Sequence, residues 1–155
     1  MKKFVFFLAV ALMLATGSRA QGINDTRHAI GLRGGWGAEL SYQHYIAPET
    51  RLEGTIGVNR YGFSFEGMYQ VMNDIMIDAP GEMKWYAGVG FGFGNWSNHR
   101  FKHGFSAGML GQAGIEYAFM EAPLMLSFDY RPGLYFTPEF DFDWSGFALG
   151  LRFYF

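Results

Sequence analysis

The stretch that decides the fold is "SGFALGLRFYF", residues 145–155. Apolar side chains recur there at every second position: Phe147, Leu149, Leu151, Phe153 and Phe155. The positions between them hold small residues, a tyrosine and Arg152. Because successive side chains of a β-strand point to opposite faces, this pattern predicts a strand with one apolar face and one small or polar face.

Residues 1–20 predict a secretory signal peptide. Lys2 and Lys3 precede an apolar run over 4–15, and Ser18 and Ala20 provide the small residues of a cleavage site before Gln21. That run is shorter than the ~20 residues of a spanning helix, which argues against the alternative of an N-terminal membrane anchor. We therefore expect one mature domain, residues 21–155.

Charge and cysteine content exclude several classes of protein. Cleavage would remove Lys2, Lys3 and Arg19, so 9 of the 12 basic residues would remain against 14 acidic residues, a net charge of −5. An acidic chain of this kind argues against nucleic acid as a partner. The chain contains no cysteine, so neither a disulfide framework nor a lipid anchor on cysteine is available.

The rest of the chain repeats the alternation seen at its end, and no later apolar run is long enough for a transmembrane helix. All five prolines fall between the alternating segments, where a missing N–H interrupts no ladder. We predict eight strands: His28–Gly34, Gly37–Ile46, Arg51–Arg60, Phe63–Asp74, Glu82–Gly94, Gly104–Phe119, Leu124–Arg131 and Trp144–Phe155.

The face opposite the apolar one carries nearly all the charges of the predicted strands. These are Arg33, Glu39, Glu53, Glu66, Lys84, Glu116, Asp129, Arg131 and Arg152, interspersed with glycine and small polar residues. A soluble barrel or sandwich would turn the apolar face inward, whereas an outer-membrane barrel turns it toward lipid. In the second case the nine charges lie in the lumen, where a near-balanced set forms a paired network that plugs the barrel.

Three features favour the outer-membrane barrel. The apolar face is built from large side chains on every predicted strand, and the opposite face is crowded with glycines, as a narrow lumen requires. The third feature is a set of aromatic residues at strand ends, typical of the girdles at the membrane interfaces: Trp36, Tyr45, Tyr61, Trp85, Trp96, Phe119, Tyr135 and Trp144. We therefore predict an all-β fold, an eight-stranded antiparallel up-and-down transmembrane β-barrel whose last strand pairs with its first.

The chain resembles the small eight-stranded outer-membrane barrels of Gram-negative bacteria, the group of OmpX-like proteins and the transmembrane domain of OmpA. The resemblance rests on the signal peptide, the eight alternating segments and the terminal "LRFYF", with "WYAGVGFGFG", "GQAGIEYAF" and "LMLSFDYRPG" as further strand-like segments. It implies a location in the outer membrane, contact with its lipid and lipopolysaccharide, and insertion by the outer-membrane assembly machinery. The aromatic residues that this machinery would read are Phe153, Tyr154 and Phe155.

Two segments between predicted strands are candidate outward loops. The first, residues 95–103, contains His99, Arg100, Lys102 and His103 beside serines, which raises the hypothesis of an acyl hydrolase. The His-x-Ser motif of the lipid A deacylase barrels is absent, and no carboxylate lies nearby to orient a histidine, so a basic loop that touches phosphates is favoured. The second, residues 132–143, carries Glu139, Asp141 and Asp143, either a solvated acidic loop or a divalent-cation site.

Together these observations predict a small outer-membrane β-barrel with a structural or loop-mediated interaction role. We expect a monomer that neither conducts ions nor catalyses a reaction and that needs no cofactor. Two alternatives stay open: a lipid A-modifying barrel enzyme, and a soluble periplasmic β-barrel that binds an apolar ligand.

Overall fold

The structure is a computed structural model that describes residues 27–35, 37–59, 62–98, 101–137 and 139–155. These residues form ten β-strands, which are β1 (His28–Gly34), β2 (Ala38–Ala47), β3 (Thr50–Asn59), β4 (Gly62–Ile75), β5 (Gly81–Asn98), β6 (Phe101–Phe119), β7 (Leu124–Tyr130), β8 (Gly133–Thr137), β9 (Asp141–Asp143) and β10 (Phe147–Tyr154). Among the described residues no helix is long and apolar enough to cross a membrane. The predicted signal peptide lies outside the described residues.

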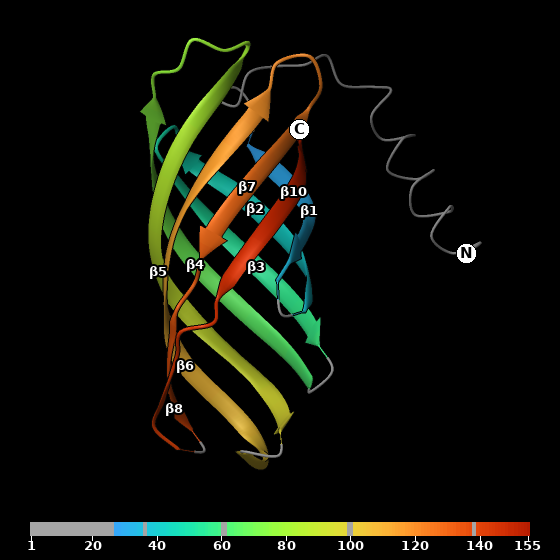
Figure 1. Cartoon of the computed structure of the whole chain (residues 1–155), viewed down its shortest axis with the longest axis vertical. Helices are drawn as coiled ribbons and strands as arrows, with labels where there is room; N and C mark the ends of the chain where they lie inside the picture. Colours follow the sequence, from blue (N-terminus) through green and yellow to red (C-terminus); the bar gives the residue numbers. More distant parts are fainter. Residues whose placement is uncertain (1–26, 36, 60–61, 99–100, 138) are drawn as a thin grey trace, which may run out of the picture.

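The strands close into a single barrel (Figure 1). Each neighbouring pair is antiparallel, β5 pairs with β6, and the pairing of β1 with β10, the first strand with the last, closes the sheet. We call each strand position around the barrel a wall. β7 and β8 both pair with β6 and together form one wall. β9 pairs with β8 and β10 pairs with β7, so these two strands form the next wall. The ten strands therefore make eight walls, and the predicted eight-stranded antiparallel β-barrel is confirmed.

The interruption between β7 and β8 has a local cause. Pro132 lies at this point and has no N–H to give to the ladder. Its carbonyl still accepts from Gly111 N at 3.0 Å, and Arg131 N donates to Gly146 O at 2.9 Å. The wall is thus interrupted at this proline while remaining attached on both sides.

The two ends of the barrel differ in height. We call the end with Phe155 and the connections 48–49, 76–80 and 120–123 the basal end, and the other end the distal end. β1 has 7 residues, whereas β5 and β6 have 18 and 19 and reach much farther toward the distal end (Figure 1). The β8–β9 hairpin is built onto this taller side through the pairing of β8 with β6.

Both predicted outward loops are largely strand, which corrects the sequence-based partition. β5 continues to Asn98 and β6 begins at Phe101, so most of residues 95–103 belongs to the β5–β6 hairpin. Residues 132–143 contain β8 and β9. The predicted last strand, Trp144–Phe155, is also shorter than expected, because β10 begins at Phe147 and Trp144 lies between β9 and β10. The two segments predicted as loops extend as strands because they pair with neighbouring strands, β5 with β6 and β8 with β6 and β9.

The predicted apolar face points outward. Its large side chains are exposed on every wall, for example Leu32, Ile56, Val89, Phe128 and Leu149. Of the residues assigned to the aromatic girdles, Trp36 and Tyr61 lie outside the described residues and the side chain of Trp96 is not described. Among the others, two do not follow this rule. Tyr45 is buried in the interior, and Tyr135 is only partly exposed, with its ring against the inner face at Gly108 and Gly133.

Glycines on the inner face of β5 let the neighbouring strand and its side chains approach. A Cβ on Gly90 would collide with the carbonyl oxygen of Gly67 and press on Met68 Sδ, whereas a Cβ on the exposed Gly67 would meet no atom within 4 Å. We predict that Gly90→Ala lowers the free energy of unfolding by about 1–3 kcal/mol through overpacking. Gly67→Ala, the matched control, should change it by less than about 0.5 kcal/mol.

The midpoint of urea unfolding of the two purified variants is the measurement. Equal midpoints for the two variants would show that the close contact at Gly90 is not a constraint on the fold.

Candidate functional site

The barrel interior is the candidate site, because it collects the charged residues of the strands. The nine predicted interior charges all lie on the inner face, with side chains that are fully buried or only slightly exposed. The structure adds Arg51, which is completely buried. The interior set is then five cations (Arg33, Arg51, Lys84, Arg131, Arg152) and five carboxylates (Glu39, Glu53, Glu66, Glu116, Asp129).

Glu53 on β3 is the centre of this network. Its Oε1 accepts from Ser41 Oγ and from Arg152 Nη2, both at 2.6 Å. Its Oε2 accepts from Gln70 Nε2 at 2.6 Å and from Arg131 Nη2 at 3.0 Å. One carboxylate therefore links four other walls of the barrel across its interior.

Arg152 of β10 is held in the same way, through every nitrogen of its guanidinium. Nε donates to Ser41 Oγ at 2.8 Å, Nη1 donates to Ser127 Oγ at 2.6 Å, and Nη2 donates to Glu53. The alternation in "LRFYF" places this arginine on the inner face while Leu151 stays outside. Charge-assisted bonds of this geometry are the strong class of hydrogen bond.

Arg33 forms a second centre farther toward the distal end. Nη1 donates to both oxygens of Glu39 at 2.8 Å, and Nη2 donates to Asp129 Oδ1 at 2.6 Å. Tyr86 OH donates to the other oxygen of Asp129 at 3.1 Å. The Arg33 fork thus joins β1 to β2 and to β7.

Arg131 connects the two centres. Besides Glu53, its guanidinium bonds Glu66 and Thr55 Oγ1, and it lies 3.8 Å from Glu39. The Glu39 and Glu66 side chains remain 17% and 11% exposed, compared with 0% for Glu53. The network is therefore dry at its centre and reaches solvent toward the distal end.

Arg51 is the interior residue that sequence reasoning missed. Its Nη1 donates to Glu116 Oε1 at 2.9 Å and to Tyr45 OH at 3.0 Å, and the Tyr86 ring lies 4.7 Å from its Cζ. The available signal was its position, because Arg51 precedes Glu53 by two residues and so belongs to the same face. Because Arg51 was the first residue of a predicted strand, it was not assigned to the inner face.

The basal end of the interior is closed by an apolar layer. It consists of Ala29, Tyr45, Met72, Tyr86, Ala118, Met125 and Tyr154, all buried and in mutual contact. Tyr154 OH donates to Phe119 O at 2.8 Å, which fixes the last strand to the end of β6. Lys84 lies at this end, 3.1 Å from the exposed carboxylate of Asp74. Solvent is thus separated from the charge network on the basal side.

Of the remaining predicted site residues that the structure describes with their side chains, Tyr154 lies in the interior and the others do not. His99 and Arg100 lie outside the described residues, and Lys102 and His103 belong to β6 but their side chains are not described. Glu139 and Asp141 are exposed, and Asp143 accepts from the Ser145 backbone N–H and hydroxyl. The described residues contain no group of three His, Cys, Asp or Glu side chains arranged to hold a metal ion. Of the terminal aromatics, Tyr154 points inward, while Phe153 is partly exposed and Phe155 exposed.

No protein-family model matches the chain, and comparisons with curated proteins and with solved structures find no match either.

The chemistry of the interior is that of a fixed charge network. Removing one member leaves its partners charged and buried, and this costs about 3–5 kcal/mol. We predict that Glu53→Gln, which leaves Arg131 and Arg152 without their shared carboxylate, lowers the free energy of unfolding by about that amount. The urea midpoint of the purified protein measures the effect.

Glu121→Gln is the matched control, since Glu121 is exposed between β6 and β7, and its effect should stay within about 0.5 kcal/mol. A Glu53→Gln variant as stable as this control would contradict the central role of Glu53.

Proposed function

We propose that the protein is a small barrel of the bacterial outer membrane that acts as a structural or interaction module, without conducting ions or catalysing a reaction. The observation that carries the proposal is the inverted polarity of the barrel. Charges fill the inside, and large apolar side chains cover the outside. In water this arrangement would expose a large apolar surface, which is unfavourable, whereas in a bilayer it places apolar atoms against lipid.

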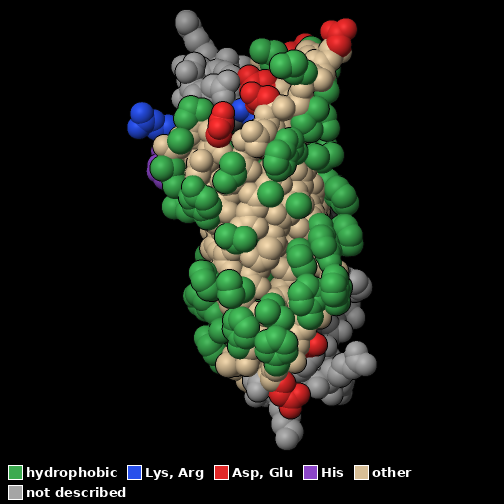
Figure 2. Space-filling view, turned by 90° about the vertical axis from the view of Figure 1, so that its left-hand side faces the viewer, with side chains coloured by type: hydrophobic (Ala, Val, Ile, Leu, Met, Phe, Trp, Pro, Cys, Tyr) green, Lys and Arg blue, Asp and Glu red, His purple; other side chains and the backbone are tan. Residues whose placement is uncertain are grey.

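The outer surface supports this assignment. Figure 2 shows one side of the barrel, on which green apolar side chains extend over the height of the molecule, while acidic side chains lie near both ends and basic ones near the upper end. A contiguous apolar belt bounded by charged rims is the surface of a membrane-spanning barrel, and monomeric soluble proteins rarely expose such a belt. The soluble alternative, in contrast, requires an apolar interior.

The interior supports the absence of conduction. Eight strands enclose a space just wide enough for side chains, and here Glu53, Arg131 and Arg152 occupy its centre. The apolar layer at the basal end lies across the remaining path. An ion would have to displace both the charge network and the apolar layer, so the lumen offers no open path across the barrel.

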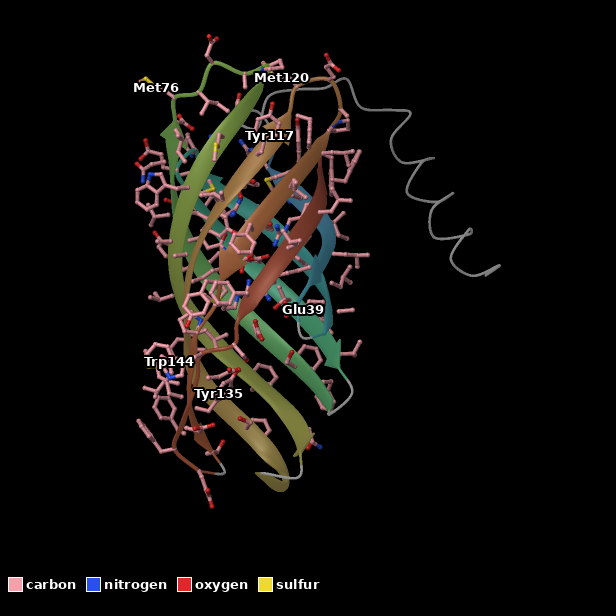
Figure 3. All side chains as sticks on the ribbon, in the orientation of Figure 1. Glu39, Met76, Tyr117, Met120, Tyr135 and Trp144 are labelled. Atoms are coloured by element: carbon pink, nitrogen blue, oxygen red, sulfur yellow. The ribbon has the colours of Figure 1, made fainter. Side chains whose placement is uncertain are left out.

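The taller distal side supports an interaction role. On the β8–β9 hairpin and just after it, Phe140 is 73% and Trp144 is 70% exposed, and Trp144 points away from the barrel (Figure 3). Glu139 and Asp141 are exposed in the same segment. Exposed aromatic and acidic side chains on this hairpin form a surface suited to recognition.

The resemblance to OmpX-like barrels adds the route into the membrane. In this proposal the assembly machinery reads Phe153, Tyr154 and Phe155, and lipid together with lipopolysaccharide surrounds the apolar belt. The signal peptide of residues 1–20 directs export.

Cell fractionation tests the location. We expect the mature protein in the outer-membrane fraction, and we expect unboiled protein in detergent to migrate differently from boiled protein on a gel, because the closed barrel survives until heated. The soluble periplasmic fraction of the same cells is the comparison. Protein recovered there in folded form without detergent would overturn the membrane assignment.

Electrical recording tests the closed lumen. Wild-type protein reconstituted into a planar bilayer should produce no steady conductance, since the charge network and the basal apolar layer occupy the path. A porin reconstituted in parallel establishes that the assay detects open channels. A sustained, ion-selective current from the wild-type barrel would replace the structural role by that of a pore.

A further inference from the structure

Two histidines face each other on the outer surface at the basal end. His28 of β1 and His44 of β2 are direct partners in the antiparallel register. Their rings are stacked with centroids 4.9 Å apart, and His44 is exposed while His28 is partly exposed. On all other described strands the corresponding outward positions are dominated by aliphatic and aromatic side chains. This pair is therefore a polar interruption of the apolar face.

Three ligand atoms converge at the pair. The Nδ1 atoms of His28 and His44 are 3.3 Å apart, and Tyr42 OH lies 2.8 Å from His28 Nδ1. A neutral imidazole carries either a proton or a lone pair on Nδ1, so His28 Nδ1 can form one well-directed hydrogen bond at a time. Tyr42 OH and His44 Nδ1 are both within reach of His28 Nδ1, so only one of them can form a well-directed hydrogen bond with it at a time.

A metal ion satisfies both imidazoles at once. Zn²⁺ binds histidine nitrogen at about 2.0–2.1 Å, and at that distance two nitrogens 3.3 Å apart subtend about 107° at the ion. The tetrahedral angle preferred by Zn²⁺ is about 109°. We propose that His28 and His44 form a surface site for a divalent transition-metal ion of the zinc and copper class, with Tyr42 OH beside the bound ion.

The composition of the site selects the class of ion. Imidazole suits Zn²⁺, Cu²⁺ and Ni²⁺, whereas Mg²⁺ and Ca²⁺ require oxygen ligands. With two imidazoles as its protein ligands, the site leaves coordination positions for water. It is thus an open site of modest affinity, distinct from the closed four-ligand sites of structural zinc.

The position of the pair gives the ion a structural effect. His28 N donates to Phe155 O at 3.3 Å, Phe155 N donates to His28 O at 2.9 Å, and the Phe155 ring stacks on the His28 imidazole. β1 meets β10 here, where the barrel closes. An ion that joins His28 to His44 ties β1 to β2 beside this seam and stabilises the folded barrel by mass action.

Metal binding by the folded mature protein in detergent tests the proposal. Titration with Zn²⁺ should give one site per chain and raise the temperature of unfolding, and Mg²⁺ at the same concentrations should have no effect. With Cu²⁺ as the probe, electron paramagnetic resonance should show two coordinated nitrogens. His44→Gln should weaken binding by ~10- to 100-fold, the loss typical even of groups that only support a ligand, and remove one nitrogen signal.

The other histidines of the chain provide the matched control. The double variant His99→Gln with His103→Gln should keep the Zn²⁺-dependent rise in unfolding temperature and both nitrogen signals, as should Tyr42→Phe. If His44→Gln binds as the wild type does, or if the His99 and His103 changes abolish binding, the site is not at His28 and His44. Both failures would leave the membrane proposal intact, because fractionation tests that separately.

Discussion

A carboxylate buried at the centre of a barrel can stay ionised only if the surrounding walls bring donors to it. Glu53 satisfies this condition with Ser41, Gln70, Arg131 and Arg152, which come from four other walls. Because each wall must hold its donor at hydrogen-bond distance, the network restricts how far these walls can shift relative to one another. An interior of apolar side chains would allow more variation in packing, whereas this one admits a single arrangement of strands.

The alternation of side chains was sufficient to predict the walls and their faces. Wherever a strand has neighbours on both sides, one face must be outward and the other inward, so the two-residue period carries over directly into burial. Arg51 shows the limit of this reasoning. With Arg51 the interior contains equal numbers of cations and carboxylates, and the same period identifies it once Glu53 is taken as the reference.

The prediction of two loops was wrong for a different reason. Phe140, Phe142 and Trp144 alternate with Asp141 and Asp143, which is itself a strand pattern, but Pro132 and Pro138 before them and the acidic residues suggested a loop. The structure shows that a proline can interrupt a wall without ending it, because the carbonyl of Pro132 remains bonded to Gly111. The histidine pair was beyond sequence reasoning, since residues 16 positions apart become neighbours only through the register of β1 with β2.

If the barrel lies in a bilayer, as proposed, the unequal height of its wall has a consequence for its orientation there. At about 3.4 Å per residue β6 is roughly 65 Å long and β1 roughly 24 Å, and exposed apolar side chains continue along β5 and β6 as far as Phe93 and Phe105. A hydrocarbon layer of uniform thickness cannot match both sides of an upright barrel. Tilting of the barrel axis, or local thickening of the lipid beside β5 and β6, relieves this mismatch. In the proposed membrane location, the lipid on the two flanks of the same small protein would then be under different strain, and the barrel would be an asymmetric inclusion in the bilayer.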